Sequence, residues 1–135
     1  MHFRVLGPDV GGVSNADLRR LFKGQRLTAA RRNSLECGGR ILALCGPRVV
    51  GLAAYERTDQ ELRVGEFGVD TESSCGSRVI ANGLLEALEL ACLAGSVPRL
   101  VLLPRGDIFD NVLRERGYRS IAQAAFGNWF EKRFV

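Results

Sequence analysis

The sequence predicts a mixed α/β fold with a mostly antiparallel sheet, one central parallel crossover and helices on both faces. Three observations support this expectation. Strand-like apolar runs alternate with amphipathic stretches, two hairpin-like pairs of strands bracket one long helix, and glycine or proline separates most of the segments. The length of 135 residues, of which 46% are hydrophobic and 25% charged, favours a single domain over residues 1–135.

Local patterns of apolar and turn-forming residues define the predicted elements. An alternating run predicts a short first strand, and a Ser-Asn pair can cap the following helix, which Gly24 ends. A Gly-Pro-Arg turn joins two apolar runs into a hairpin, and Gly65 and Gly68 mark a bulge or the close approach of a ligand in the next strand. In order, the expected elements are strand 2–6, helix 15–23, helix 28–35, strands 40–45, 49–56 and 61–70, helix 77–94, strand 99–104, helix 107–117 and two strands around 126–128.

The long helix over residues 77–94 sets the expected topology. Its apolar residues recur at steps of three and four, which is typical of a helix that packs one face against a sheet. The strands before and after it imply a right-handed crossover with parallel pairing, whereas the hairpins on either side imply antiparallel pairing. The apolar face comprises Ile80, Leu84, Ala87, Leu88, Ala91 and Cys92.

The cysteines argue against a metal site. None of the four forms a CxxC pair, and His2 is the only histidine, so no metal is expected. Cys45 and Cys92 lie among apolar neighbours and are expected to be small core residues. The first ten residues do not resemble a secretory signal, which favours a cytoplasmic protein with reduced thiols. No apolar run approaches the length that spans a membrane, so no membrane partner is expected.

Basic residues concentrate in the first third of the chain. The net charge is +4, and between residues 17 and 40 seven basic residues stand against two acidic ones, Asp17 and Glu36. Three interpretations stay open: a solvated face, a surface for an acidic acceptor or partner, and a nucleic-acid surface. No aromatic residues interleave with the arginines, which makes nucleic acid the weakest of the three. The basic residues are Arg19, Arg20, Lys23, Arg26, Arg31, Arg32 and Arg40.

A small polar loop between a strand and the long helix is the most informative segment. The strand ends at Val69-Asp70, and Gly76 stands where the helix begins. The first turn of a helix has amides without intrahelical partners and the positive end of the helix dipole, so a phosphate docks there readily. Ser73, Ser74 and Ser77 add hydroxyl donors, and Arg78 adds charge; an ordinary helix N-terminus accounts for the same pattern.

The order of elements and the residues around this loop resemble the GNAT superfamily of acyl-coenzyme A-dependent N-acyltransferases. The shared features are Val69-Asp70, the pyrophosphate loop over residues 73–78 with Gly76, the buried strand RLVLLP and the helix ending Arg116-Gly117-Tyr118. Three positions differ from the family pattern. Ser73 replaces Gln or Arg, Arg78 replaces a small residue, and Leu113 replaces a tyrosine that protonates the leaving thiolate in many members.

The resemblance implies acetyl-coenzyme A, or another acyl-coenzyme A, as co-substrate. It implies that backbone groups of Phe67, Gly68 and Val69 pair with the pantetheine arm, where a bulge separates the fourth and fifth strands. It also implies that the pyrophosphate is held by Ser74 and by the amides of the residues that follow. These residues are Cys75, Gly76, Ser77, Arg78 and Val79.

The implied chemistry is direct attack of an amine on the acyl carbon, which requires a base. Glu66 on the fourth strand is the candidate base, with a solvent-facing strand residue as the alternative. Tyr55 is the candidate donor to the thiolate, against a tyrosine of the core or rim, and Tyr118 is expected to be a packing residue. The acceptor is a small-molecule or protein amine. The alternative functions are a non-catalytic acyl-coenzyme A- or protein-binding domain and a basic nucleic-acid-binding module.

The C-terminal segment carries a cluster of aromatic residues. The expected role of this cluster is core packing, with an interface for a homodimer as the alternative. The residues are Phe126, Trp129, Phe130 and Phe134.

Overall fold

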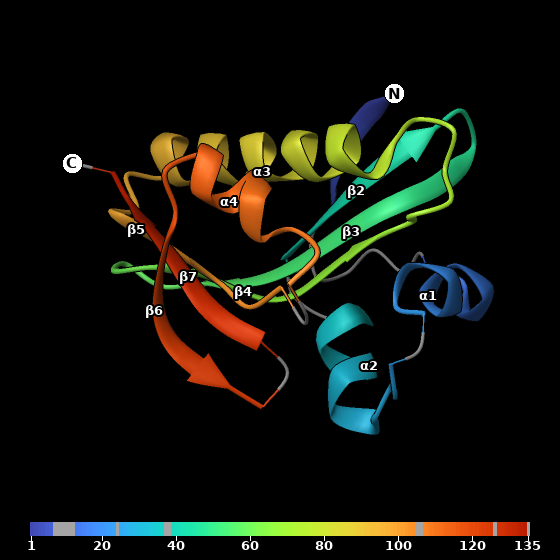
Figure 1. The fold of residues 1–135 in the computed structure, drawn as a ribbon, viewed down its shortest axis with the longest axis horizontal. Coiled ribbons are helices and arrows are strands. Elements are labelled where there is room, and N and C mark those ends of the chain that lie inside the picture. The colour runs from blue at the N-terminus through green and yellow to red at the C-terminus, as the bar shows by residue number, and fades with distance from the viewer. Residues whose placement is uncertain (7–12, 24, 37–38, 105–106, 126, 135) are drawn as a thin grey trace.

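The computed structural model describes residues 1–6, 13–23, 25–36, 39–104, 107–125 and 127–134. These residues form four helices around a sheet of seven strands (Figure 1). The elements are β1 His2–Leu6, α1 Asn15–Leu21, α2 Ala29–Glu36, β2 Gly39–Cys45, β3 Arg48–Arg57, β4 Leu62–Val69, α3 Ser77–Ala94, β5 Arg99–Leu102, α4 Asp110–Glu115, β6 Arg119–Ala124 and β7 Gly127–Arg133. This order confirms the elements expected from the sequence.

The strand order is β1-β2-β3-β4-β5-β7-β6. Every neighbouring pair is antiparallel except β4 and β5, which α3 connects and which run parallel. The predicted mixed sheet with one central parallel crossover is therefore confirmed.

Helices cover both faces of the sheet. α3 and α4 lie on one face and α1 and α2 on the other, as Figure 1 shows from the side. The larger core lies under α3, whose residues Ile80, Leu84 and Leu88 are fully buried as its apolar spacing predicts. A smaller core under α1 and α2 gathers Leu18 and Phe22 against β2 and β3.

A bulge in β4 changes which side chains face which helices. Ala54 of β3 pairs with Glu66 while Tyr55 pairs with Val64, so Gly65 is the extra residue. Val64 and Phe67 consequently both face α3, and Glu66 between them faces α2. Of the two irregularities expected in this strand, Gly65 is the bulge.

Gly68 serves a different purpose. A Cβ atom at this position would lie 2.7 Å from the Phe22 ring and 3.1 Å from the Leu21 carbonyl oxygen. The glycine thus lets the end of α1 pack directly on β4, so the close approach comes from the protein's own helix.

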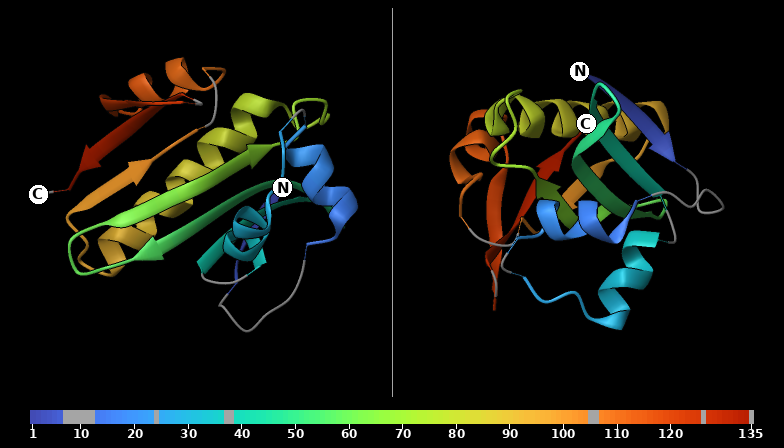
Figure 2. Two further views of the ribbon diagram at one scale, coloured as in Figure 1. Left: turned by 90° about the horizontal axis from the view of Figure 1, so that it is seen from below. Right: turned by 90° about the vertical axis from the view of Figure 1, so that its right-hand side faces the viewer.

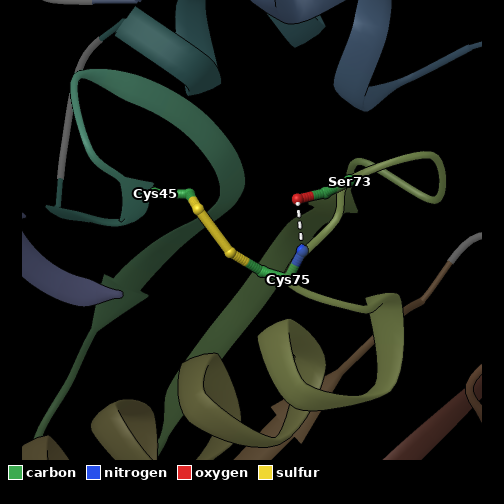
Figure 3. Close-up of a disulfide and its surroundings, with 3 residues drawn as sticks. All are labelled: Cys45, Ser73 and Cys75. Atoms are coloured by element: carbon green, nitrogen blue, oxygen red, sulfur yellow. Dashed lines mark hydrogen bonds between the residues drawn. A yellow bond between two sulfur atoms is a disulfide. The ribbon is translucent and has the colours of Figure 1, made fainter.

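The cysteines depart from the expectation of reduced thiols. Cys45 at the end of β2 and Cys75 before α3 are joined by a disulfide (Figure 3). Cys92 is free and fully buried in α3, as expected of a core residue. The pairing joins residues that are 30 positions apart, which the sequence pattern around either cysteine does not indicate. In the described part of the chain, no helix has the length and apolar character needed to cross a membrane.

Candidate functional site

The parallel strands β4 and β5 separate halfway along β4. Their pairing runs from Leu62 opposite Leu100 to Val64 opposite Leu102, and the Leu103 amide then donates to the Val64 carbonyl. β4 continues to Val69, but its residues after Val64 have no partner on β5 among the described residues. The bulge at Gly65 lies where the two strands part. The backbone of residues 67–69 is therefore paired with β3 on one edge and not with β5 on the other.

The loop after β4 is anchored at its first residue, Asp70. Its amide donates to the Val50 carbonyl at 2.8 Å. Its carboxylate, 3% exposed, accepts from the Arg20 side chain at 3.1 Å and from the Glu72 amide at 3.0 Å. Helix α1 and strand β3 thus hold the start of the loop in place. Arg48 adds a second cation at 3.6 Å from the same carboxylate.

The rest of the loop folds back on itself before α3. The Ser73 hydroxyl accepts from the Cys75 amide at 3.2 Å, and the Ser73 carbonyl accepts from the Gly76 amide at 3.1 Å. The disulfide then ties Cys75 to the end of β2 (Figure 3). This loop is therefore fixed at both ends, which suits a site that must hold a ligand in one position.

Gly76 presents the N-terminus of α3 without a cap. Its φ of +85° is in the region that favours glycine, and no side chain forms a capping hydrogen bond there. No acidic residue lies in the first turn to neutralise the helix dipole. Ser77, Arg78 and Val79 thus open the helix with a positive electrostatic end beside the strand separation.

Arg78 is held away from the loop by another element. Its guanidinium forms an ion pair with Glu115 at the end of α4, and both side chains are more than half exposed. Val79 is exposed as well. An exposed ion pair contributes little stability, so Arg78 can exchange Glu115 for an anionic ligand at small cost.

Glu66 is buried and bound to Arg31. The Arg31 Nε and Nη2 atoms donate to its two carboxylate oxygens at 3.0 and 2.7 Å, in a bidentate pair. Glu66 is thus not the solvent-facing residue of the alternative interpretation, since its side chain is only 4% exposed.

Arg31 is itself held by several groups at the start of α2. Its guanidinium donates to the Gln25 side chain at 2.9 Å and to the Arg26 carbonyl at 3.0 Å, and it lies 5.6 Å from the centre of the Phe22 ring. The ion pair between Arg31 and Glu66 therefore connects the α1–α2 segment to β4 near the point where β4 and β5 separate.

Tyr55 and Glu66 lie on opposite faces of the sheet. The Tyr55 ring packs over Gly39, where a Cβ atom would lie 2.4 Å from it, on the face that α3 covers. Glu66 faces α2. The structure does not bring these two candidate residues together.

Two residues near the end of α4 are occupied by packing. Leu113 is fully buried in the larger core. The hydroxyl of Tyr118 donates to Glu89 at 2.9 Å, and burial, followed by the charge of Glu89, raises the pKa of Tyr118. Tyr118 is thus a packing residue, as expected, and neither residue offers a proton to the site.

Most basic residues of the first third have partners within the protein. In addition to Arg20 and Arg31, Lys23 pairs with Glu72, the Arg32 side chain donates to Asn15, and Arg40 is buried. Within the described residues, carboxylates thus pair with three of the seven cations, Arg20, Lys23 and Arg31, whereas Arg32 donates to a neutral amide and Arg40 to the Leu35 carbonyl. The positive charge that this segment offers to an anion is reduced accordingly.

Comparisons with known proteins add a structural likeness. No model of a known protein family matches the sequence, and no curated protein matches it. An acetyltransferase from Streptococcus agalactiae 2603 matches with a TM-score of 0.70 and 16% identity over 98% of each chain. A GNAT family acetyltransferase from Elizabethkingia anophelis with acetyl-CoA bound matches with a TM-score of 0.68 and 11% identity over 98% of each chain.

N-acetylglutamate synthase from Neisseria gonorrhoeae, complexed with coenzyme A and N-acetyl-glutamate, is a third match. Its TM-score is 0.70 at 11% identity, with 100% of this chain covering 36% of that longer one. At such low identities these likenesses concern the fold alone. The chain has the GNAT fold, which confirms the resemblance that its sequence suggested.

Proposed function

We propose that this protein transfers an acyl group, acetyl in the simplest case, from acyl-coenzyme A to an amine. The observation that supports this most directly is one juxtaposition. The edge of β4 after Val64, which has no strand partner on the β5 side among the described residues, leads directly into an anchored loop and an uncapped helix N-terminus at Gly76. A thioester with a long pantetheine arm and a pyrophosphate needs both features in this order. Neighbours with the same fold contain coenzyme A or acetyl-CoA.

The backbone of β4 would bind the pantetheine arm. Phe67 is held by an edge-to-face contact of 5.6 Å with Phe109, and Gly68 by the end of α1, so this stretch is preorganised. The amides of Ser77, Arg78 and Val79, with the Ser74 hydroxyl, would bind the pyrophosphate against the helix dipole, while the Cys75 and Gly76 amides, which donate to Ser73, would hold the loop in shape. Arg78 would add its charge after leaving Glu115.

The acceptor amine would reach the thioester from the α1–α2 side, where Glu66 lies. The amine nitrogen attacks the acyl carbon, the carbon–sulfur bond breaks, and coenzyme A leaves as a thiolate. Glu66 would receive the ammonium proton through a water molecule. Arg31 positions this carboxylate and must loosen its bidentate contact when the proton arrives. Leu113 cannot protonate the thiolate, which is tolerable because a thiol of pKa about 8.5 is a good leaving group.

Acceptor identity is open to a direct assay. We would measure release of free coenzyme A thiol from acetyl-CoA in the presence of primary amines, including polyamines, amino acids, aminoglycosides and peptides. One or more of these should raise the rate. Glu66→Gln should then lower kcat about a hundredfold or more with the KM for acetyl-CoA little changed. Binding of acetyl-CoA without transfer to any amine would instead indicate a non-catalytic binding domain, consistent with the loss of the α4 tyrosine.

A further inference from the structure

On the α1 and α2 side of the sheet, the helices of the described residues cover only one half of the face. α1 and α2 contact β3 and β4, whereas β5, β7 and β6 have no helix over them in the view from below (Figure 2, left). The strand registers place four residues in one row across this bare half. In order from β4 to β6, the row is Arg63, Val101, Glu131 and Arg119.

Arginines surround Glu131, a buried carboxylate of this surface. The Glu131 side chain is 2% exposed. Its carboxylate oxygens form ion pairs with guanidinium nitrogens of Arg99 at 2.6 Å, Arg119 at 2.6 Å and Arg133 at 3.2 Å. The Arg119 contact first, then the other arginines, lowers the pKa of Glu131 to about 2 in spite of its burial. Glu131 therefore stays charged and organises the arginines around it.

The arginines outnumber the carboxylates on this surface. The second acid is Glu61, whose carboxylate forms ion pairs with Arg63 at 3.0 Å and with Arg99 at 3.8 Å. Within the described part of the chain, four guanidinium groups thus share two carboxylates. We call the group Arg63, Arg99, Arg119 and Arg133 the arginine face.

Three arginines of the arginine face point outward. Arg63, Arg119 and Arg133 keep 57%, 70% and 62% of their side chains exposed. In the ion pairs of the described residues, Arg63 and Arg133 use only their Nε atoms. Their terminal nitrogens can therefore donate to a further carboxylate, for which a guanidinium fork is well suited.

Trp129 lies on the same face of the sheet, and its side chain is partly buried. The Arg63 guanidinium lies 5.5 Å from the ring centre. A surface for single-stranded nucleic acid needs exposed aromatic rings on which bases stack. One partly buried ring already in contact with Arg63, among four arginines, favours a partner that offers carboxylates.

We propose that the arginine face binds an acidic segment of a partner protein in an extended conformation. Arg63 and Arg119 are three strand spacings apart, which amounts to about 14 Å. Acidic side chains four residues apart in an extended peptide lie at about the same distance. Such a segment supplies the negative charge that this surface lacks. This surface is separate from the coenzyme site of the proposed function and binds without it.

The fluorescence of Trp129 reports on this surface directly, because the chain contains one tryptophan. We would titrate the whole protein at low salt, without coenzyme, with a synthetic peptide whose glutamates stand four residues apart. A peptide with glutamine in their place is the control, and calorimetry repeats each titration. We expect saturable binding of the glutamate peptide alone, weakened by salt.

Neutral substitutions locate the site. Arg63→Gln and Arg119→Gln should each weaken binding about threefold, as expected for exposed ion pairs. Arg4→Gln removes an exposed arginine from the opposite edge strand and should leave binding unchanged. Thermal unfolding of each variant shows whether it is folded.

Three outcomes would overturn the proposal. The first is no saturable binding of the glutamate peptide at about 1 mM by either method, an affinity too weak for a specific partner. The second is equal weakening by Arg4→Gln, which would indicate general attraction of charges. The third is tighter binding of a single-stranded oligonucleotide than of the peptide, which would assign the surface to nucleic acid.

Discussion

Removal of the Cys45–Cys75 disulfide should destabilise the protein and loosen the loop before α3. The bond joins residues 30 positions apart. Chain-entropy estimates for a closed loop of this length give a stabilisation of about 3.6 kcal/mol at 25 °C. For a chain of this size, a loss of that magnitude lowers Tm by about 13 °C.

The assay is urea unfolding, followed by circular dichroism, with and without a reductant. The Cys45→Ser/Cys75→Ser variant should unfold like the reduced wild type, and reductant should not change it further. The reduced protein should also bind coenzyme A more weakly, because Cys75 lies one residue before Gly76. Unfolding curves of the wild type that coincide with and without reductant would refute the reasoning, as would alkylation of both thiols in the native, non-reduced protein.

Three other perturbations follow from the contacts described above. The Arg119 contact lowers the pKa of Glu131 from 4.5 to about 2, so the ionised carboxylate contributes to folding stability above pH 4.5, and this contribution is lost as pH falls toward 2. Glu131→Gln should therefore flatten the acid side of a curve of unfolding free energy against pH, and an unchanged slope would contradict this. Gly68→Ala should cost about 1–3 kcal/mol in urea unfolding because the new Cβ meets Phe22, and a neutral effect would mean that α1 moves freely. Arg31→Met should cost about 3–5 kcal/mol because it removes the bidentate cation from the buried Glu66 carboxylate, and replacing Glu66 by Gln in the same chain should restore part of the loss; no restoration would argue against a coupled pair.

The sequence predicted the elements well because each depends on local patterns. The spacing of Ile80, Leu84 and Leu88 is visible within one helix, and their burial follows from it. Gly65 was recognisable as an irregularity because a glycine inside a strand weakens it and often marks a bulge.

The contacts of the candidate site were less predictable because they depend on register and on distant segments. Strict alternation would place Glu66 on the same face as Val64. The bulge at Gly65 turns it to the other face, where Arg31, 35 positions away, binds it. No spacing rule relates these two residues. The same holds for the arginine face, whose members are dispersed in the sequence and meet only through strand pairing.

Isothermal titration calorimetry with acetyl-CoA tests the central claim most directly. The wild type should bind in the micromolar range. Gly76→Val should abolish binding because it places a side chain at the helix N-terminus, whereas Gly117→Val, at another glycine of positive φ, should retain it. Absence of binding by the wild type, or equal binding by the folded Gly76→Val variant, would contradict the assignment of this loop and strand edge as a coenzyme site.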